Sequence, residues 1–212
     1  MAASRPGGRT ARVRADVLRA AGDLLAEQGF AQLDLGEVAR RAEVGRTTVY
    51  RRWGTAIALV TDLLIDMAEQ SLPRSRTGHL DQDLRANARL VQRTLADPRQ
   101  GPLFKAIIAG ATWDEGAATA LRTFYRTRVA EWSPCVAESV ERGELPAGTD
   151  PAAVIRAVSA PLYYDLLITG RVPDEPAADR AANAAVLAAR AGAFVDLGGT
   201  MESNTSDVEG PA

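Results

Sequence analysis

Apolar residues recur at spacings of three and four along most of the chain, which is the pattern of amphipathic helices. Glycine, proline or Asp-Pro separates one apolar stripe from the next, as expected at helix ends. No stretch alternates apolar and polar residues for long enough to indicate a strand. The pattern predicts an all-α fold of about nine helices arranged as a bundle. The apolar stripes occupy residues 13–25, 35–42, 49–53, 57–68, 84–95, 103–108, 121–140, 154–167 and 176–195.

Three residues bear on the ends and the continuity of these helices. Thr10 precedes the first stripe and is the expected N-cap of the first helix. Pro134 lies inside the stripe 121–140, and Pro161 lies inside the stripe 154–167. A proline inside a helix removes a backbone hydrogen bond and clashes with the preceding turn, so we expect a kink or break at Pro134.

The segment from Leu35 to Trp53 carries two short apolar stripes separated by Glu43-Val44-Gly45. This spacing suits a helix, a tight turn and a second helix, with the small Ala39 where the two helices approach closely. The second helix is expected to present a row of polar residues outward, with no acid among them. These candidate DNA-binding residues are Arg46, Thr47, Thr48, Tyr50, Arg51 and Arg52. The alternative is an ordinary helical hairpin with solvated arginines.

Such a helix can enter a DNA major groove, because arginine can bond guanine edges and threonine can bond a base edge or touch a thymine methyl. Tyr50 and the remaining arginines suit phosphate oxygens. Arg9 and Arg12 extend this surface, since with Arg5 and Arg14 they form an N-terminal cluster that contains no acid. Cations at a helix N-terminus oppose the helix dipole, so an anion is expected nearby. The alternative is a solvated tail.

The distribution of charge also points to a polyanion at one end of the chain. The 212 residues carry a formal net charge of −2, but residues 1–54 hold ten arginines against six acids. The other residues hold 15 basic side chains against 21 acids. A basic N-terminal module on an acidic body indicates that this end binds nucleic acid. Chance surface charge is the alternative.

Composition argues against several other classes of protein. The single cysteine, Cys135, excludes an internal disulfide framework, and the single histidine, His79, excludes a multi-histidine metal site. No phosphate-binding glycine loop, nucleophile elbow or Cys/His cluster occurs, so we expect no enzyme, no cofactor and no metal. Residues 1–10 lack the apolar core of a signal peptide, and no apolar run reaches about 18 residues. We therefore expect a cytoplasmic protein that does not associate with membranes.

These pieces, in this order, resemble the tetracycline-repressor (TetR) family of bacterial regulators. The resemblance rests on a long first helix, the Gly29-Phe30 stop, the Val38-Ala39 pair, and the run from Thr48 to Trp53 followed by an apolar helix. It covers residues 10–70 well and the body more loosely, through residues 161–170. It implies a homodimer that binds operator DNA through the second helix of the helix-turn-helix. It also implies a ligand cavity in the body whose occupation releases the DNA.

Three residues depart from the family's pattern. Glu43 stands in the turn where the family usually has glycine, and a left-handed conformation there costs about 1 kcal/mol. Gly45 is the alternative site of that strain. Asp34 stands where the family usually has a threonine or serine that touches a phosphate; it caps a helix well but repels a phosphate. Ala56 replaces a common lysine, and we expect Arg46 and the N-terminal arginines to compensate.

The sequence divides into a helix-turn-helix domain (1–54), a ligand-binding and dimerisation domain (55–197) and a small, polar tail (198–212) that we expect to be disordered. Most of the few aromatic residues lie in the second domain and can line a pocket between helices. The candidate pocket residues are Leu64, Met67, Phe104, Ile108, Trp113, Tyr125, Trp132, Cys135 and Tyr163. Core packing is the alternative for each of them. No charged set aligns on an apolar face, which favours a small, largely apolar effector.

Homodimerisation is expected through residues of about 152–195, because their small side chains let helices pack closely across a two-fold axis. The favoured function is a ligand-responsive, sequence-specific repressor that leaves its operator DNA when a small molecule binds. Two alternatives stay open: a DNA-binding regulator without a small-molecule ligand, and a helical protein-interaction adaptor.

Overall fold

The computed structural model describes residues 6–70 and 75–195. These residues contain nine α-helices and no strand. The all-α fold predicted from the sequence is confirmed. The helices are α1 (Pro6–Gln28), α2 (Leu35–Arg41), α3 (Arg46–Arg52), α4 (Ala56–Gln70), α5 (Leu80–Ala96), α6 (Gln100–Ala111), α7 (Glu115–Glu141), α8 (Pro151–Tyr164) and α9 (Glu175–Arg190). A 3-10 turn, Phe30–Gln32, follows α1, and a π-helical turn, Asp165–Thr169, follows α8.

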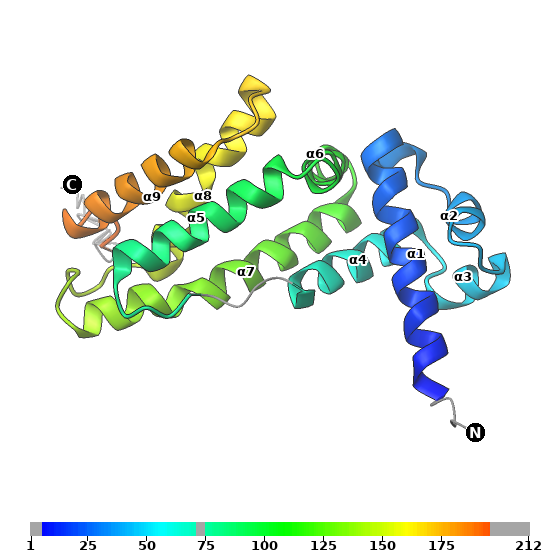
Figure 1. Ribbon diagram of the computed structural model, residues 1–212, viewed down its shortest axis with the longest axis horizontal. Helices are drawn as coiled ribbons and strands as arrows, with labels where there is room; N and C mark the ends of the chain where they lie inside the picture. The colour runs from blue at the N-terminus through cyan, green and yellow to red at the C-terminus, as the bar shows by residue number, and fades with distance from the viewer. Residues whose placement is uncertain (1–5, 71–74, 196–212) are drawn as a thin grey trace, which may run out of the picture.

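The molecule is elongated, with α1–α3 at one end and α5–α9 bundled at the other (Figure 1). We call α1–α3 the head and α5–α9 the body. Helix α4 begins beside α3 and runs toward the body, where it packs against the long α7. One helix therefore touches both the head and the body.

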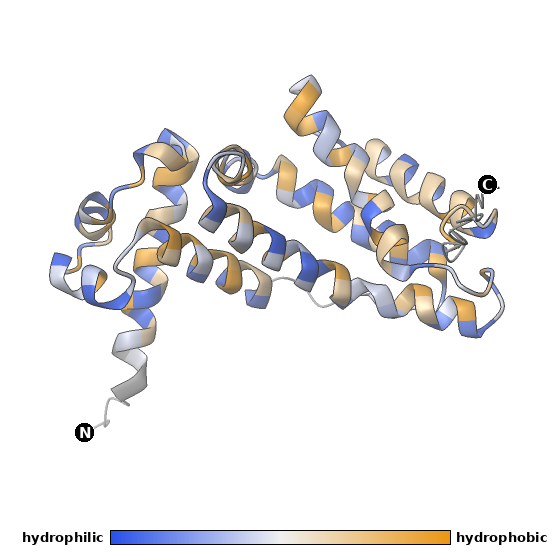
Figure 2. Cartoon of the chain, turned by 180° about the vertical axis from the view of Figure 1, so that it is seen from behind, coloured by the Kyte–Doolittle hydropathy of each residue, from blue (hydrophilic) through white to orange (hydrophobic). Residues whose placement is uncertain are grey.

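Two hydrophobic cores stabilise this arrangement, and apolar residues gather along the inward sides of the helices (Figure 2). The first core combines residues of the head with residues of α4, α6 and α7, among them Val17, Leu24, Val49, Leu59, Phe104 and Ile107. The second core lies within the body, and includes Leu84, Trp132, Val158 and Val186. Because the first core crosses residue 54, the change of charge there does not mark a break in packing.

Two expectations about helix ends and continuity are corrected. Helix α1 begins at Pro6 rather than after a cap at Thr10; proline fits the first helical turn, where its missing N–H has no partner to lose. Helix α7 runs unbroken through Pro134, so the expected break does not occur, while a kink there stays a prediction. Asp114 caps its start, and packing against α4, α6 and α8 outweighs the one lost hydrogen bond. The expected disordered tail, 198–212, lies outside the described residues.

One segment, Pro151–Thr169, is long and apolar enough by length and composition to cross a membrane. The segment is not an uninterrupted apolar run, because Arg156 and Asp165 lie within it. Val154 and Leu162, on its buried side, belong to the second core. Helix α8 packs against α5, α7 and α9, so we assign the segment to the bundle.

Candidate nucleic-acid interface and internal cavity

Helices α2 and α3 meet at a tight corner. Asp34 caps α2 as predicted, its carboxylate accepting a hydrogen bond from the Glu37 N–H at 2.9 Å. Val38, Ala39 and Val49 are fully buried inside the corner. Burial of Val49 fixes which face α3 turns away from the protein.

The turn between the two helices holds backbone strain at Glu43. This residue has a φ of 56°, the one positive φ of a non-glycine residue in the described ranges. Gly45 has a φ of −62° and is the extended N-cap of α3. The strain therefore lies at Glu43, and Gly45 does not relieve it.

The outer face of α3 is exposed and cationic. Five of the six residues predicted for DNA contact are exposed and Thr48 is half-buried; the exposed ones are Arg46, Thr47, Tyr50, Arg51 and Arg52. Within the described part of the chain, none of the three arginines forms an ion pair. Arginines on α2, by contrast, are paired: Arg40 with Glu37 and Arg41 with Glu27. Three arginines without an ion pair thus lie within the seven residues of the helix predicted to read DNA.

The N-terminal arginines do not act as one cluster. Arg12 is exposed, and no acid within the described residues pairs with it. Arg14, two residues on, instead faces α4, where it pairs with Asp62 at 2.7 Å and with Asp66 at 2.5 Å. The expectation that Arg14 belongs to an anion-seeking arm is corrected. The side chain of Arg9 and the whole of Arg5 lie outside the described residues.

Asp62 links three helices through its carboxylate. It accepts hydrogen bonds from Arg14 on α1 and from the Trp53 Nε1–H at the end of α3, the latter at 2.9 Å. Partial burial opposes its ionisation, but the hydrogen bonds from Arg14 and Trp53 outweigh that effect and lower the pKa of Asp62. The pKa of Arg14 is raised by its hydrogen bond to Asp62. Both groups therefore stay charged, and the position of α3 is coupled to α1 and α4.

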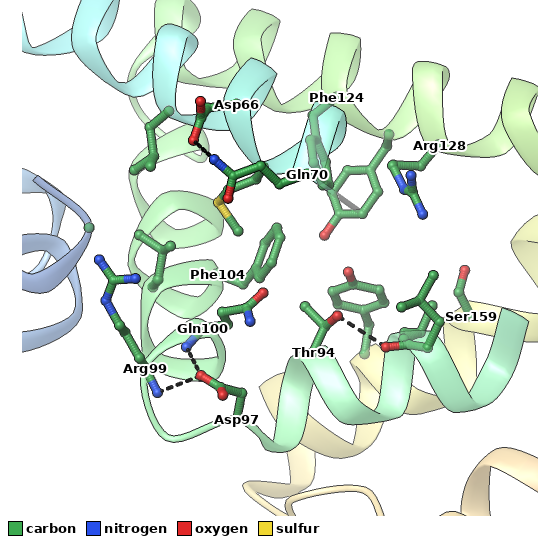
Figure 3. A pocket seen from close by; sticks show the side chains of 18 of the residues that line it. Asp66, Gln70, Thr94, Asp97, Arg99, Gln100, Phe104, Phe124, Arg128 and Ser159 are labelled. Atoms are coloured by element: carbon green, nitrogen blue, oxygen red, sulfur yellow. Dashed lines mark hydrogen bonds between the residues drawn. The ribbon is translucent and has the colours of Figure 1, made fainter. Parts of the chain in front are cut away.

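A cavity of about 720 Å³ lies between α1, α4, α5, α6, α7 and α8. Figure 3 shows Phe104 and Phe124 inside it, with Asp66 and Gln70 on one side and Thr94 and Ser159 on another. Its volume is within the range of small-molecule sites in proteins. Five of the predicted pocket residues line it: Met67, Phe104, Tyr125, Trp132 and Tyr163.

Four predicted pocket residues lie elsewhere. Leu64 and Cys135 are buried in the two cores, and Ile108 packs on the first core. Trp113 is 65% exposed and meets Phe30 edge to face, at 6.1 Å between ring centroids. Helix α4 turns Leu63 and Met67 toward the cavity, and Leu64 lies next to Leu63 but faces the core. The predicted rotation of α4 about its axis was therefore wrong by about one residue.

The cavity wall also includes polar residues, which the apolar pattern of the sequence does not indicate. They are Arg19, Asp66, Gln70, Asn87, Thr94, Asp97, Arg99, Gln100, Arg128 and Ser159. No sequence signal separates them from solvated residues, because helices far apart in the chain contribute them. The aromatic rings form a continuous series, Phe104–Phe124–Tyr125–Tyr163, with centroid separations of 5.3–5.6 Å. Burial raises the pKa of the Tyr163 hydroxyl to about 12, so this hydroxyl stays protonated at neutral pH.

The polar network reaches the cavity through Asp66. This carboxylate lines the cavity, pairs with Arg14 and accepts a hydrogen bond from the Gln70 amide at 2.6 Å. Arg14 in turn bonds Asp62, and Asp62 bonds Trp53. A chain of four side chains therefore connects the cavity wall with the end of α3.

Exposed apolar residues gather where α8 ends and on the outer side of α9. The first group is Tyr164, Leu167, Ile168 and Val172, and α9 adds Leu187. The α8 end projects from the bundle in Figure 1. Val158, Leu162 and Val186 lie within the range expected to form the dimer contact, but they are buried within the protomer. A contact through residues 152–195 therefore has to use other residues of this range, among which the exposed apolar group is the most hydrophobic.

Two family models match the chain. Residues 17–61 match the model of bacterial regulatory proteins of the tetR family. Residues 75–185 match the model of the tetracyclin repressor-like C-terminal domain. The first match includes α2 and α3 with the unpaired arginines, and the second includes most of the cavity.

Individual proteins are similar over most of their length. The transcriptional regulator YdeS of Bacillus subtilis is 33% identical over 155 residues, 73% of this chain and 78% of YdeS. AqdR of Rhodococcus erythropolis is 28% identical over 147 residues, 69% of this chain and 70% of AqdR. Among solved structures, the TetR family regulator SCO0332 superposes with a TM-score of 0.65 at 29% identity, covering 82% of this chain and 96% of SCO0332. The repressor MexZ of Pseudomonas aeruginosa has the same fold, with a TM-score of 0.64 at 21% identity, and covers 87% of this chain and 98% of MexZ.

Proposed function

This chain belongs to the TetR family of helix-turn-helix transcriptional regulators, and from that premise we propose that it is a cytoplasmic repressor released from its operator by a small, largely apolar effector. Its DNA-reading element is α3, with Arg46, Thr47 and Thr48 at the end that enters the major groove first. Arg12 and Arg51 bind phosphates, because their charges have no partner in the described residues, and Arg52 binds one from its place over the Trp53 ring, 5.0 Å from the ring centroid. MexZ, a repressor of the same fold, supports repression as the direction of control.

The observation that carries the proposal is the chain of side chains from the cavity to the reading helix. Asp66 lies on the cavity wall, and Trp53 ends α3. Arg14 and Asp62 join them through hydrogen bonds of 2.5–3.2 Å. An occupant that displaces Asp66 must therefore disturb contacts that set the angle of α3.

Helix α4 supplies the mechanical part of this coupling. It carries Asp62 on the side of the head and Leu63, Asp66 and Met67 on the wall of the cavity. An effector that fits only when α4 shifts binds the shifted conformation better and so increases its population. DNA then weakens the effector by the factor by which the effector weakens DNA, which is about 5–150-fold for a coupling of about 1–3 kcal/mol.

Two protomers are needed to read a palindromic operator. We place the two-fold contact at the exposed apolar group on the α8 end and α9, Tyr164, Leu167, Ile168, Val172 and Leu187. The two copies of α3 must then lie about 34–36 Å apart, or a multiple of that distance, to enter successive major grooves.

The test begins with selection of bound duplexes from random DNA. We expect a palindromic sequence to be enriched, and recovery of no preferred sequence would end the proposal. The coupling is tested on that operator with Asp66→Asn, which weakens the network at the cavity wall without touching the DNA face. We expect altered operator affinity, whereas Asp81→Asn, which removes an exposed ion pair of α5 with Arg190 away from the cavity, should leave it unchanged.

A further inference from the structure

The last turn of α3 carries two neighbouring arginines in different settings. Arg51 and Arg52 are both exposed, and neither forms an ion pair within the described residues. The guanidinium carbon of Arg52 lies 5.0 Å from the centroid of the Trp53 ring, which is a cation–π contact. Arg51 makes no such contact in the described part of the chain. Trp53 therefore restricts the side chain of one arginine but not of the other.

The Trp53 ring is itself held in place from α4. The ring belongs to the first core and is 8% exposed, and its Nε1–H donates a hydrogen bond to the Asp62 carboxylate at 2.9 Å. Asp62 also accepts from Arg14, and Arg14 donates to Asp66 on the cavity wall. The surface on which Arg52 rests is thus bonded, through three further side chains, to the cavity.

The two ends of α3 have separate supports. Val49 is fully buried in the corner between α2 and α3 and directly follows Thr47 and Thr48, so the packing of the corner fixes these two threonines. Trp53 lies four residues beyond Val49, about 6 Å along the helix axis. This end is the one bonded to α4 through Asp62. A disturbance that reaches Asp62 from the cavity therefore acts first on the end of α3 that does not read bases.

We infer that Trp53 is a positioning residue that couples the cavity network to a phosphate contact made by Arg52. The ring occupies one face of the guanidinium and leaves its N–H edge available to a phosphate. Because the ring is fixed, Arg52 loses little side-chain freedom when the phosphate binds. When an occupant of the cavity displaces Asp66, the ring is no longer fixed and this contact weakens.

The inference makes a statement about how the DNA is released. Loss of a phosphate contact lowers affinity for every sequence alike, since phosphates carry no sequence information. Cavity occupation therefore weakens DNA binding without changing which sequence is preferred. The inference rests on the proposed function in taking Arg52 as a phosphate contact and the cavity as the effector site.

The test uses fluorescence anisotropy of the full-length protein with the selected operator and with a duplex of unrelated sequence. Trp53→Phe keeps an aromatic ring but removes the N–H that bonds Asp62. We expect it to weaken binding to both duplexes by the same factor, about twofold to fivefold, which is the range of an exposed cation–π contact. Selection from random DNA with this variant should recover the operator of the parent. A changed operator, or unchanged affinity for both duplexes, overturns the inference.

A double-mutant cycle tests whether Trp53 acts through Arg52. Added to Arg52→Ala, Trp53→Phe should have no further effect on DNA affinity, because the side chain that it positions is gone. Added to Arg51→Ala, the matched control in the same turn of α3, it should keep its full effect. A purely structural role of Trp53 would weaken DNA binding equally in both backgrounds, and that result overturns the inference.

Asp66→Asn carries the same cycle to the cavity wall. It should weaken binding to both duplexes alike in the Arg51→Ala background, and should have no further effect in the Arg52→Ala background. Thermal unfolding of each variant verifies folding, and if Trp53→Phe fails to fold, Asp66→Asn decides. Equal effects of Asp66→Asn in the two backgrounds overturn the inference.

Failure of the inference can be distinguished from failure of the proposed function. Selection by the parent protein that recovers no preferred sequence contradicts the proposed function, and the cycle on the unrelated duplex still decides whether Trp53 acts through Arg52. A selected operator together with equal effects in the two backgrounds contradicts the inference and leaves the proposed regulator intact.

Discussion

Arg12 and Arg14 lie two residues apart on α1 and have opposite surroundings. Two positions correspond to a turn of about 200° around a helix, so the side chains point to opposite sides. Arg14 meets Asp62 and Asp66, whereas Arg12 faces solvent. At the scale of single residues, pairing therefore decides which arginines are available to a polyanion.

A first prediction separates residues that position DNA from residues that read it. Arg12→Ala should weaken binding to all duplexes alike and reduce the slope of log affinity against log salt by about 1. Thr48→Val should instead change preference at one or two base pairs, by about 1–3 kcal/mol each. Fluorescence anisotropy over a salt series, with mutated operators, measures both. Arg40→Ala is the control, since Arg40 is occupied by Glu37; an Arg40→Ala effect as large as that of Arg12→Ala would contradict the assignment.

A second prediction concerns the strained turn. Glu43→Gly places the residue that tolerates a positive φ at the φ of 56°, and should raise the free energy of unfolding by about 0.5–1 kcal/mol. Glu43→Ala removes the same side chain without relieving the backbone, so it should give no comparable gain. Urea unfolding measures the three proteins side by side. If glycine destabilises the protein relative to alanine, the turn is not strained as described.

At the scale of elements, α4 is bonded to the head through the Asp62 carboxylate, and the charge of this carboxylate contributes to the stability of the fold. Asp62 has a lowered pKa in the folded protein, so its ionised form stabilises the fold above the unfolded pKa of about 3.9. That contribution is lost as the pH falls through the lower, folded pKa. The coupling of α1, α3 and α4 is therefore predicted to weaken in acid.

The third prediction follows from the lowered pKa of Asp62 in the folded protein. Asp62→Asn should be less stable than the parent at neutral pH, and the difference should shrink as the pH falls below about 4. Chemical unfolding at a series of pH values measures it. Asp16→Asn, in an exposed pair, should show little difference at any pH. If the difference in the free energy of unfolding between Asp62→Asn and the parent stayed constant down to the lowest pH at which both fold, the ionised carboxylate would not be the source of the extra stability.

The helices and the DNA-reading face could be predicted from the sequence, because each depends on local patterns of residues. Two apolar stripes around Glu43-Val44-Gly45 define the corner, and the buried Val49 then determines what α3 exposes. The cavity depends on the rotation of α4, α5 and α7 relative to one another, which no local pattern specifies. A phase difference of one residue separates Leu63, on the cavity wall, from Leu64, in the core. Asn87 looks like any polar residue of an amphipathic helix until its neighbours are known.

At the scale of the whole molecule, close packing besides the polar network joins the head and α4 to the body. Phe30 packs on Gly110 of α6, where an added Cβ would lie 2.5 Å from the Phe30 Cγ. Ile57 of α4 packs on Gly116 of α7, where an added Cβ would lie 2.8 Å from two Ile57 atoms. Such tight contacts transmit displacement rather than absorb it, because packed interiors are poorly compressible. The orientation of each head is thus tied to its body, and the spacing of two heads is tied to the contact between bodies.

The last prediction concerns that contact. Ile168 and Leu187 are 68% and 67% exposed, and neither packs into the protomer's own cores. An isologous contact buries each of them twice, once per protomer, so one substitution introduces two charges into it. Ile168→Asp with Leu187→Asp should therefore give a folded monomer by light scattering at micromolar concentration, with operator affinity reduced at least tenfold because only one half-site is engaged. Ile65→Asp, at a residue that is 48% exposed on α4, is the matched control and should remain dimeric. A double variant that stays dimeric and binds operator as the parent does would place the two-fold axis elsewhere on the molecule.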